Sequence, residues 1–297
     1  MTTDMFRMLA QIEQGDGFIA ALDQSGGSTP GALAGYGVAE DRYSTDEEMF
    51  GLIHDMRTRI ITSPCFNGEK VIGAILFERT MDGEAAGMPV PETLWDRGVV
   101  PFLKVDKGLE DEADGVKLMK PMPELDALLV RAKAKGIFGT KMRSVIEQAS
   151  PTGIAAIVAQ QFEVAAQINA HGLMPIIEPE VSIKSPERDA CDRLLMAEIL
   201  KCLDSVPDGQ RVMLKLTLPA EADLFAPLVS HPKVLRVVAL SGGFSRAEAC
   251  RQLAANPGVI ASFSRALLSD LRDGMSEDEF DSSLGDAIDE IHGASVA

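Results

Sequence analysis

The chain has 297 residues, of which 46% are hydrophobic and 25% charged, a balance typical of a globular protein with a large buried core. It carries 28 basic against 45 acidic side chains, and the net charge of −17 argues against nucleic acid or an anionic membrane as a partner, because both require a basic surface. An anionic small molecule is compatible with this charge only if basic residues gather in one pocket.

The N-terminal residues and the cysteines indicate the cellular compartment of the protein. Residues 1–17 form an amphipathic start with acidic side chains, unlike the basic stretch and apolar core of a secretory signal. No apolar run approaches the roughly 20 residues that cross a bilayer. The four cysteines have no CxxC spacing and the four histidines lie far apart, so we expect reduced thiols and no metal site. These features predict a cytoplasmic protein.

Eight short apolar runs alternate with longer amphipathic stretches along the chain. Several runs are apolar nearly throughout, as in parallel strands that are buried on both faces. We expect strands at Phe18–Leu22, Val71–Phe77, Val99–Val105, Ile137–Met142, Leu173–Val181, Arg211–Leu218, Val234–Leu240 and Val259–Phe263.

Helix start signals stand between these runs. Capping boxes are expected at Ser44-Thr45-Asp46-Glu47 and at Ser276 with Glu279. A third helix should begin at Pro151-Thr152 and close near His171-Gly172, where glycine suits the turn after a helix. The two capping boxes precede apolar residues at helical spacing, namely Met49, Leu52, Ile53, Met56 and Ile60 in the first case and Phe280, Leu284, Ala287, Ile288 and Ile291 in the second.

Repeated strand–helix alternation predicts the α/β class and a single (β/α)₈ TIM barrel, a fold of about 250 residues. A doubly wound open sheet shows the same alternation and is the alternative. No linker or change of composition divides the chain, so residues 1–297 are expected to form one TIM-barrel domain. The segments Met81–Pro91 and Lys107–Met122 are irregular and charged, and we expect loops there over one mouth of the barrel.

Charged residues gather at the carboxyl ends of the expected strands, where barrel enzymes have their functional face. Residues two apart on a strand share a face, which pairs Lys104 with Asp106, Lys141 with Arg143, and Glu178 with Glu180. A buried set of structural ion pairs is the alternative to a functional site. If the side chains converge, they form a pocket of net charge +2 that suits an anionic substrate, with Lys104, Lys141, Arg143, Lys215 and Arg265 against Asp23, Glu178 and Glu180.

Lys215 is the leading candidate for a nucleophile. It is in phase with Met213 and Thr217 and opposite an apolar face that should meet the helices, so it is expected to point into the barrel. Apolar surroundings and neighbouring cations favour the neutral amine, which can form a Schiff base with a carbonyl. Lys104 has an acid two residues away, whereas Lys141 has a basic neighbour and stays a rival.

A phosphate site is predicted where the last two strands end. Ser241-Gly242-Gly243 follows a buried strand and leads into a helix near Ser245, and Arg265 ends the next strand. Glycine amides and a helix N-terminus bind anions, and barrels often hold phosphate at these two loops. A Ser-Gly-Gly sequence alone is commonly only a turn, so the prediction depends on its pairing with the arginine.

These residues resemble the class I (Schiff-base) fructose-1,6-bisphosphate aldolases, most closely their short bacterial form. The matching segments occur in family order along nearly the whole chain: Leu22-Asp23-Gln24-Ser25, Phe102–Gly108, Lys141-Met142-Arg143, Ile177-Glu178-Pro179-Glu180, Leu214-Lys215, Leu240-Ser241-Gly242-Gly243 and Ser264-Arg265-Ala266-Leu267.

The resemblance implies a metal-independent lyase without a cofactor that acts in glycolysis and gluconeogenesis. It would reversibly cleave fructose 1,6-bisphosphate to dihydroxyacetone phosphate and glyceraldehyde 3-phosphate. Lys215 would attack the C2 carbonyl, Glu178 would be the general acid/base, and Asp23 and Lys141 would act at the C4 hydroxyl. A homo-oligomer is a further expectation. The substrate-binding residues would be Ser241, Gly242, Gly243 and Arg265 at the C1 phosphate, and Lys104, Arg143 and Glu180 elsewhere in the pocket.

The chain also departs from the family pattern. Larger members have a tryptophan where Met142 stands and a tail ending in tyrosine, whereas this sequence stops at Val296-Ala297. Members tend to carry a basic residue soon after the first strand, where this chain has Gly31-Ala32-Leu33, so a shorter ketose monophosphate is expected to be cleaved comparatively well. The alternatives are another Schiff-base sugar-phosphate lyase, such as a deoxyribose-phosphate or transaldolase type, and a non-catalytic sugar-phosphate-binding barrel.

Overall fold

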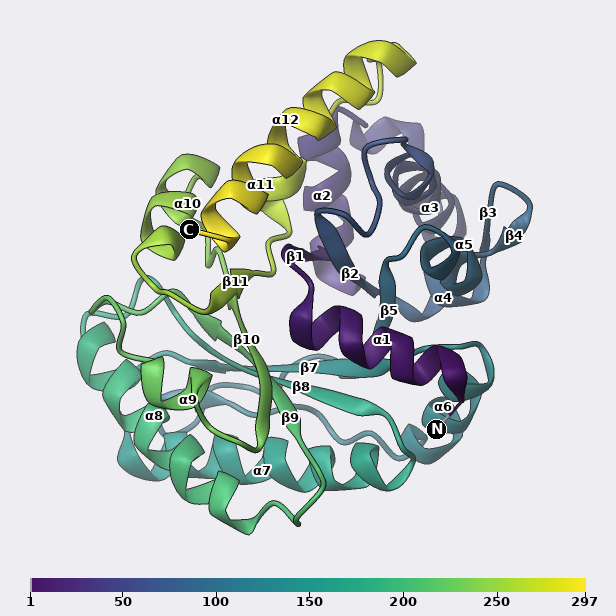
Figure 1. Cartoon of the computed structure of the whole chain (residues 1–297). Coiled ribbons are helices and arrows are strands. Elements are labelled where there is room, and N and C mark those ends of the chain that lie inside the picture. The colour runs from purple at the N-terminus through teal and green to yellow at the C-terminus, as the bar shows by residue number, and fades with distance from the viewer. Residues whose placement is uncertain (1) are drawn as a thin grey trace.

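The computed structural model describes residues 2–297, and its centre is a barrel of eight parallel strands with helices around it (Figure 1). The strands are neighbours in the order β1-β2-β5-β7-β8-β9-β10-β11, which is also their order in the chain. A doubly wound sheet requires a point at which the strand order reverses, and this sheet has none. The (β/α)₈ barrel is therefore confirmed, and the open-sheet alternative is wrong.

Each strand of the barrel coincides with one of the expected runs. β7 continues past Met142 to Ile146, because the short antiparallel strand β6 (Val116–Lys117) pairs with its end. The barrel strands are β1 (Phe18–Leu22), β2 (Val71–Leu76), β5 (Val100–Lys104), β7 (Gly139–Ile146), β8 (Met174–Val181), β9 (Val212–Thr217), β10 (Val234–Leu240) and β11 (Val259–Ala261).

Helices connect the strands and cover the outside of the barrel (Figure 1). No helix in the described part of the chain combines the length and the apolar character needed to cross a membrane. The helices are α1 (Thr3–Gln14), α2 (Thr29–Tyr36), α3 (Asp46–Thr62), α4 (Glu78–Asp82), α5 (Val90–Asp96), α6 (Leu125–Ala134), α7 (Pro151–Ala170), α8 (Arg188–Ser205), α9 (Ala226–Val229), α10 (Arg246–Ala254), α11 (Arg265–Leu268) and α12 (Glu277–Ser295), with 3₁₀ turns at Gly26–Ser28 and Glu40–Arg42.

The helix start signals are largely confirmed. Ser276 and Glu279 form the expected capping box of α12, and α7 begins at Pro151. The box before α3 is formed by Thr45 and Glu48, one residue later than expected, because the Glu48 carboxylate accepts the backbone N–H groups of both Thr45 and Ser44. The expected face of α12 is wholly buried, whereas on α3 Leu52 is only partly buried.

Residues 81–91 are not the irregular loop that their charges suggested. They contain the end of α4, a hairpin of β3 (Glu84–Ala85) and β4 (Met88–Pro89), and the start of α5. The segment is ordered because Met81, Ala85 and Val90 are buried beneath its charged residues. Residues 107–122 are mostly irregular, as expected, apart from β6.

The apolar residues form two layers, one between strands and helices and one inside the barrel. The interior layer includes Phe102, Ile176 and Met213, together with Met8 and Ile12 from α1. Figure 1 shows α1 lying across one end of the barrel, where these two side chains cover the interior. The amino end of the barrel is thus closed by apolar contacts, and the carboxyl end is left for polar residues.

The barrel closes between β11 and β1 with little backbone pairing. The strand ladder stops at these two strands, and a hydrogen bond from Ala21 N to Phe263 O, 3.1 Å long, joins the chain segments across the gap. We call this gap the seam. Because its backbone pairing is sparse, side-chain contacts have more influence on its geometry than at the other strand pairs.

A buried carboxylate on α8 supports the loop after β9. Asp192 has a fully buried side chain, and its Oδ2 accepts a hydrogen bond from Ala220 N at 2.9 Å. Arg188 Nη2 lies 3.8 Å from the same oxygen, while Oδ1 has no partner within the described residues. Burial raises the pKa of Asp192 to about 6.

We expect this carboxylate to destabilise the fold as pH rises. Between its ordinary value of 3.8 and about 6, the folded protein keeps a proton that the unfolded chain has lost, so the free energy of unfolding falls through this interval. The pKa difference corresponds to about 3 kcal/mol. Asp192→Asn does not titrate and keeps an acceptor for Ala220 N. Urea unfolding should show that the free energy of unfolding of the variant, relative to that of the wild type, rises by about this amount from about pH 4 to about pH 7.

The control for this experiment is Asp204→Asn, since Asp204 is exposed on the same helix and is not among the charges that act on Asp192. Its difference from the wild type should change little with pH. An Asp192→Asn curve that runs parallel to the wild-type curve over this range would contradict the assignment.

Candidate active site

A pocket of ≈1130 Å³ opens at the carboxyl end of the barrel. The structure brings ten of the eleven predicted site residues to its wall, whereas Gly243 lies just behind it, next to Arg265. The ten come from seven different strands or the loops that follow them: Asp23, Lys104, Lys141, Arg143, Glu178, Glu180, Lys215, Ser241, Gly242 and Arg265.

Strand alternation explains why these side chains reach the interior. Met213 belongs to the apolar layer inside the barrel, and Lys215, two residues further along β9, points the same way. The same relation holds on β8 between Ile176 and Glu178. The charged side chains therefore form the layer directly above the apolar interior.

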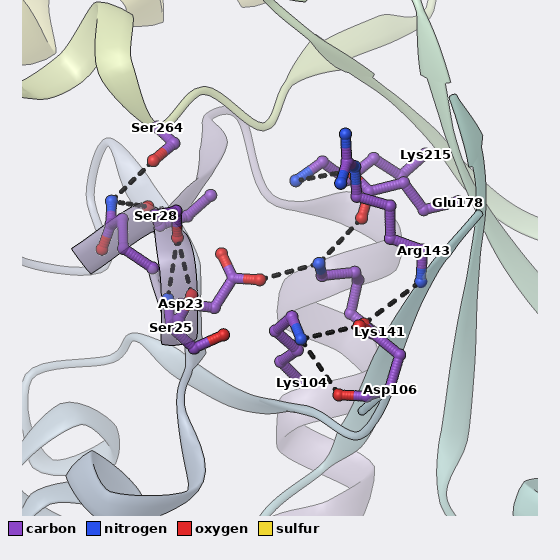
Figure 2. Close-up of polar contacts among 12 residues, drawn as sticks. Asp23, Ser25, Ser28, Lys104, Asp106, Lys141, Arg143, Glu178, Lys215 and Ser264 are labelled. Atoms are coloured by element: carbon purple, nitrogen blue, oxygen red, sulfur yellow. Dashed lines mark hydrogen bonds and ion pairs between the residues drawn. The ribbon is translucent and has the colours of Figure 1, made fainter. Parts of the chain in front are cut away.

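Four of these side chains form a continuous chain of ion pairs, which we call the central charge chain (Figure 2). Lys141 Nζ lies 2.7 Å from Asp23 Oδ2 and 2.8 Å from Glu178 Oε2. The other oxygen of Glu178, Oε1, lies 3.2 Å from Lys215 Nζ. Their side chains are between 3% and 11% exposed, so solvent screens these charges little.

The two lysines of this chain differ in their surroundings. Burial alone would favour neutral Lys141, but the carboxylates of Asp23 and Glu178 outweigh it and raise the pKa of Lys141 far above its usual range. In the same way, the Lys141 and Lys215 ammonium groups hold the pKa of Asp23 well below its usual range in spite of burial. Lys141 is thus held as a cation between two carboxylates, whereas Lys215 has one carboxylate partner.

A second set of ion pairs lines the wall beside β5 and β7. Lys104 Nζ lies 2.7 Å from Asp106 Oδ1, and Asp106 Oδ2 accepts a hydrogen bond from Arg143 N at 3.2 Å (Figure 2). The Arg143 side chain pairs with Glu180, whose charge raises the pKa of the guanidinium although burial opposes this. Of the three cations expected to bind substrate, these two already have carboxylate partners.

The pocket has a net charge of +1, so the expected value of +2 is wrong. Asp106 and Glu78 also line the pocket, as does Lys107, so six basic side chains face five acidic ones. Asp106 had been expected beside Lys104 but was not counted in the pocket, whereas Glu78 and Lys107 lie in the segments after β2 and β5, to which no site residue had been assigned. In residues 2–297, no three histidine, cysteine, aspartate or glutamate side chains are grouped so that they could hold a metal ion.

The predicted phosphate corner has the expected backbone. Gly242 and Gly243 have φ values of +62° and +114°, in the region that favours glycine, and α10 follows with Ser245 as its cap. The Arg265 side chain is exposed beside Gly243 and makes no hydrogen bond or ion pair within the described residues. The corner therefore offers a guanidinium and a glycine turn to an anion.

Gln161 is a supporting residue that the sequence reading missed. It is fully buried on α7, and its Oε1 accepts the backbone N–H of Glu178 at 2.9 Å while Nε2 donates to Ser144 Oγ at 2.6 Å. The amide thus fixes the backbone that carries Glu178. The sequence contained a sign of this role, because Gln161 is a polar residue at a helical position between the apolar residues Ile157 and Ala165.

Polar residues of the loops after β1 and β11 were also missed. Ser25 N donates to Ser28 Oγ at 3.0 Å, and Gln24 Nε2 donates to Ser264 Oγ at 2.6 Å (Figure 2). All four residues line the pocket. Because they belong to loops, strand alternation predicts nothing about their direction.

Comparisons with known proteins agree with this architecture. The family model described as "Glycolytic: Fructose-bisphosphate aldolase class-I" matches residues 10–217, a range that contains Asp23 and Lys215 but ends before the phosphate corner. A fructose-bisphosphate aldolase from Plasmodium falciparum, solved with TRAP and a small-molecule inhibitor, is 20% identical, with a TM-score of 0.81 over 98% of this chain and 94% of its own. A Corynebacterium glutamicum protein is 15% identical, with a TM-score of 0.58 over 99% and 93%. At these identities the two structures show a shared fold.

The central charge chain predicts unequal stability losses at neutral pH. Lys141→Met leaves the Asp23 and Glu178 carboxylates buried without their shared cation, which should cost about 3–5 kcal/mol of unfolding free energy. Lys215→Met should cost less, since Glu178 keeps Lys141 as its partner. Urea unfolding near neutral pH measures both. Equal losses, or a greater loss for Lys215→Met, would contradict this account.

Proposed function

This chain belongs to the class I fructose-bisphosphate aldolase family, and we propose that it is a Schiff-base aldolase that reversibly cleaves fructose 1,6-bisphosphate to dihydroxyacetone phosphate and glyceraldehyde 3-phosphate. The observation that carries the proposal is the central charge chain, in which a strand-borne lysine shares a buried carboxylate with a second, more tightly paired lysine. The protein would act in glycolysis and gluconeogenesis in the cytoplasm.

Lys215 is the proposed nucleophile. A nucleophilic amine must lose its proton, and Lys141 is poorly suited because Asp23 and Glu178 raise its pKa. Lys215 lies on the same side of the barrel with a single partner oxygen at 3.2 Å. Lys141 is therefore the better fixed cation, and Lys215 is the amine left for covalent chemistry.

The proposed chemistry uses the carboxylates on either side of the lysines. Lys215 Nζ attacks the C2 carbonyl, and Glu178 transfers protons so that water leaves and an iminium forms. The C3–C4 bond then breaks, its electron pair moves toward the iminium nitrogen, and the proton of the C4 hydroxyl passes to a base. Asp23 is the proposed acceptor because its carboxylate lies beside the two lysines, 2.7 Å from Lys141 Nζ, and Lys141 fits the stabilisation of the developing oxygen charge.

Substrate binding is proposed at the two ends of the pocket. The C1 phosphate would contact Ser241, the backbone of Gly242 and Gly243, and the exposed guanidinium of Arg265. The remaining hydroxyls and the second phosphate would face the opposite wall of the pocket. Lys104, Arg143 and Glu180 are the candidate residues of that wall for these contacts. The mechanism assigns no step to a metal or an organic cofactor.

Borohydride reduction tests the nucleophile directly. With dihydroxyacetone phosphate present, reduction should add one triose-phosphate mass to the peptide that contains Lys215, because borohydride fixes the iminium as a stable amine. Lys215→Met should abolish the label, and cleavage of fructose 1,6-bisphosphate by the wild type should survive a chelator. Peptide mass spectrometry and a coupled cleavage assay provide these readouts.

Two outcomes would contradict this assignment. A label found mainly on Lys141 would exchange the roles of the two lysines. Efficient cleavage of deoxyribose 5-phosphate with poor cleavage of fructose 1,6-bisphosphate would replace the proposed substrate.

Glu178 provides a second test. Glu178→Gln removes proton transfer while keeping nearly the same size, and kcat for cleavage should fall by about 10²–10⁴-fold. Glu180→Gln, two residues along the same strand, is the matched control and should affect KM more than kcat, since Glu180 pairs with Arg143. A kcat reduced more by the control than by Glu178→Gln would overturn the assignment of the general acid/base.

A further inference from the structure

A buried arginine lies directly behind the loop that follows β1. Arg57 on α3 is 1% exposed, next to the buried Met56, and no carboxylate among residues 2–297 forms an ion pair with it. Burial lowers the pKa of Arg57 to about 10, although Asp23 opposes this. Burying a guanidinium without an ion pair costs free energy. Its hydrogen bonds to neighbouring oxygens offset part of this cost.

These partners connect α3 to the pocket. Arg57 Nη2 donates to the backbone oxygen of Gln24 and, at 3.2 Å, to its side-chain Oε1, while Nη1 donates to Thr80 Oγ1 at 2.8 Å. The contact to Oε1 orients the Gln24 amide, so that Nε2 faces the seam. Across the seam Nε2 donates to Ser264 Oγ at 2.6 Å, and on its own side it donates to Ala21 O on β1 at 3.2 Å.

The contact between Gln24 and Ser264 spans the seam at the level of the pocket. The residue before Gln24 is Asp23, and the residue after Ser264 is Arg265, so the hydrogen bond joins the immediate neighbours of two site residues. The backbone below it is joined through Ala21 N and Phe263 O, without a ladder. The distance between Asp23 and Arg265 therefore depends on side-chain contacts more than on backbone pairing.

We propose that Arg57 and Gln24 are positioning residues, which together with Ser264 form a seam clamp that holds Asp23 and Arg265 at a fixed separation. The inference rests on the proposed function, in which Asp23 acts at the C4 hydroxyl and Arg265 binds the C1 phosphate. Carbon–carbon cleavage requires both at once, because the phosphate anchors the substrate against which the carboxylate must be aligned. A displacement of about 1 Å at such a site can reduce the rate 100-fold.

Gln24→Met tests the clamp, since it keeps the length of the side chain and removes both its donor and its acceptor. We expect kcat/KM for fructose 1,6-bisphosphate cleavage to fall by about 10–100-fold. Borohydride trapping of saturating dihydroxyacetone phosphate on Lys215 should persist, because this triose has no C4 hydroxyl to align. A general loss of structure would abolish trapping together with cleavage.

Gln11→Met is the matched control. Gln11 is also half-buried, and its amide also donates to a backbone oxygen, that of Gly68 at 2.8 Å, but it lies on α1 at the closed end of the barrel. Its kcat/KM should stay within about twofold of the wild type. Equal losses in the two variants would overturn the inference.

Amide hydrogen exchange tests the seam clamp independently of catalysis. Gln24→Met should speed amide exchange in residues 22–28 and 262–268, on both sides of the seam, and Gln11→Met should leave both segments unchanged. Unchanged exchange in residues 262–268 of Gln24→Met would overturn the clamp, whatever the activity.

A separate result bears on the function itself. If the wild-type protein gives no trapped triose phosphate on Lys215, the proposed function fails, while the exchange experiment still decides whether the seam is clamped. If the wild type is trapped and Gln24→Met cleaves as well as the wild type, only the further inference fails.

Discussion

The central constraint on this protein is that four buried titratable side chains share one chain of ion pairs. Asp23, Lys141, Glu178 and Lys215 alternate in sign along one chain of contacts with little solvent around them. Removing Lys141 leaves two carboxylates buried without their shared cation, which is more costly than the ion pairs themselves are favourable. The fold must therefore deliver one side chain from each of four strands to one place, and the parallel barrel does this at its carboxyl end.

The same constraint separates the roles of the two lysines. Both are buried lysines on barrel strands, and their sequence surroundings distinguish them only weakly. In the fold, Lys141 lies between two carboxylates, whereas Lys215 contacts one oxygen of a carboxylate that it shares. The more strongly paired amine is the better permanent cation, and the less strongly paired amine is the better candidate for covalent chemistry.

Support for the charged layer comes from polar residues on the helices and loops around it. Gln161 reaches from α7 to the backbone of Glu178, and Arg57 reaches from α3 to the backbone after Asp23. Both lie on otherwise apolar helix faces, where the amide of Gln161 makes hydrogen bonds through both its atoms and Arg57 makes them through both terminal nitrogens, although not through Nε. This arrangement fixes the strand ends more tightly than backbone pairing alone, most of all at the seam.

The sequence by itself determined where the strands lie and the inward direction of Lys215, because burial on both faces and a two-residue side-chain period are local properties. It also predicted a glycine turn after β10, which the structure shows with left-handed backbone at Gly242 and Gly243. The tertiary structure alone decided between a barrel and an open sheet, which carboxylates meet Lys141 and Lys215, that Glu78 enters the pocket, and that Gln24 meets Ser264. Those contacts join residues up to 240 positions apart, and their distances depend on how the barrel closes.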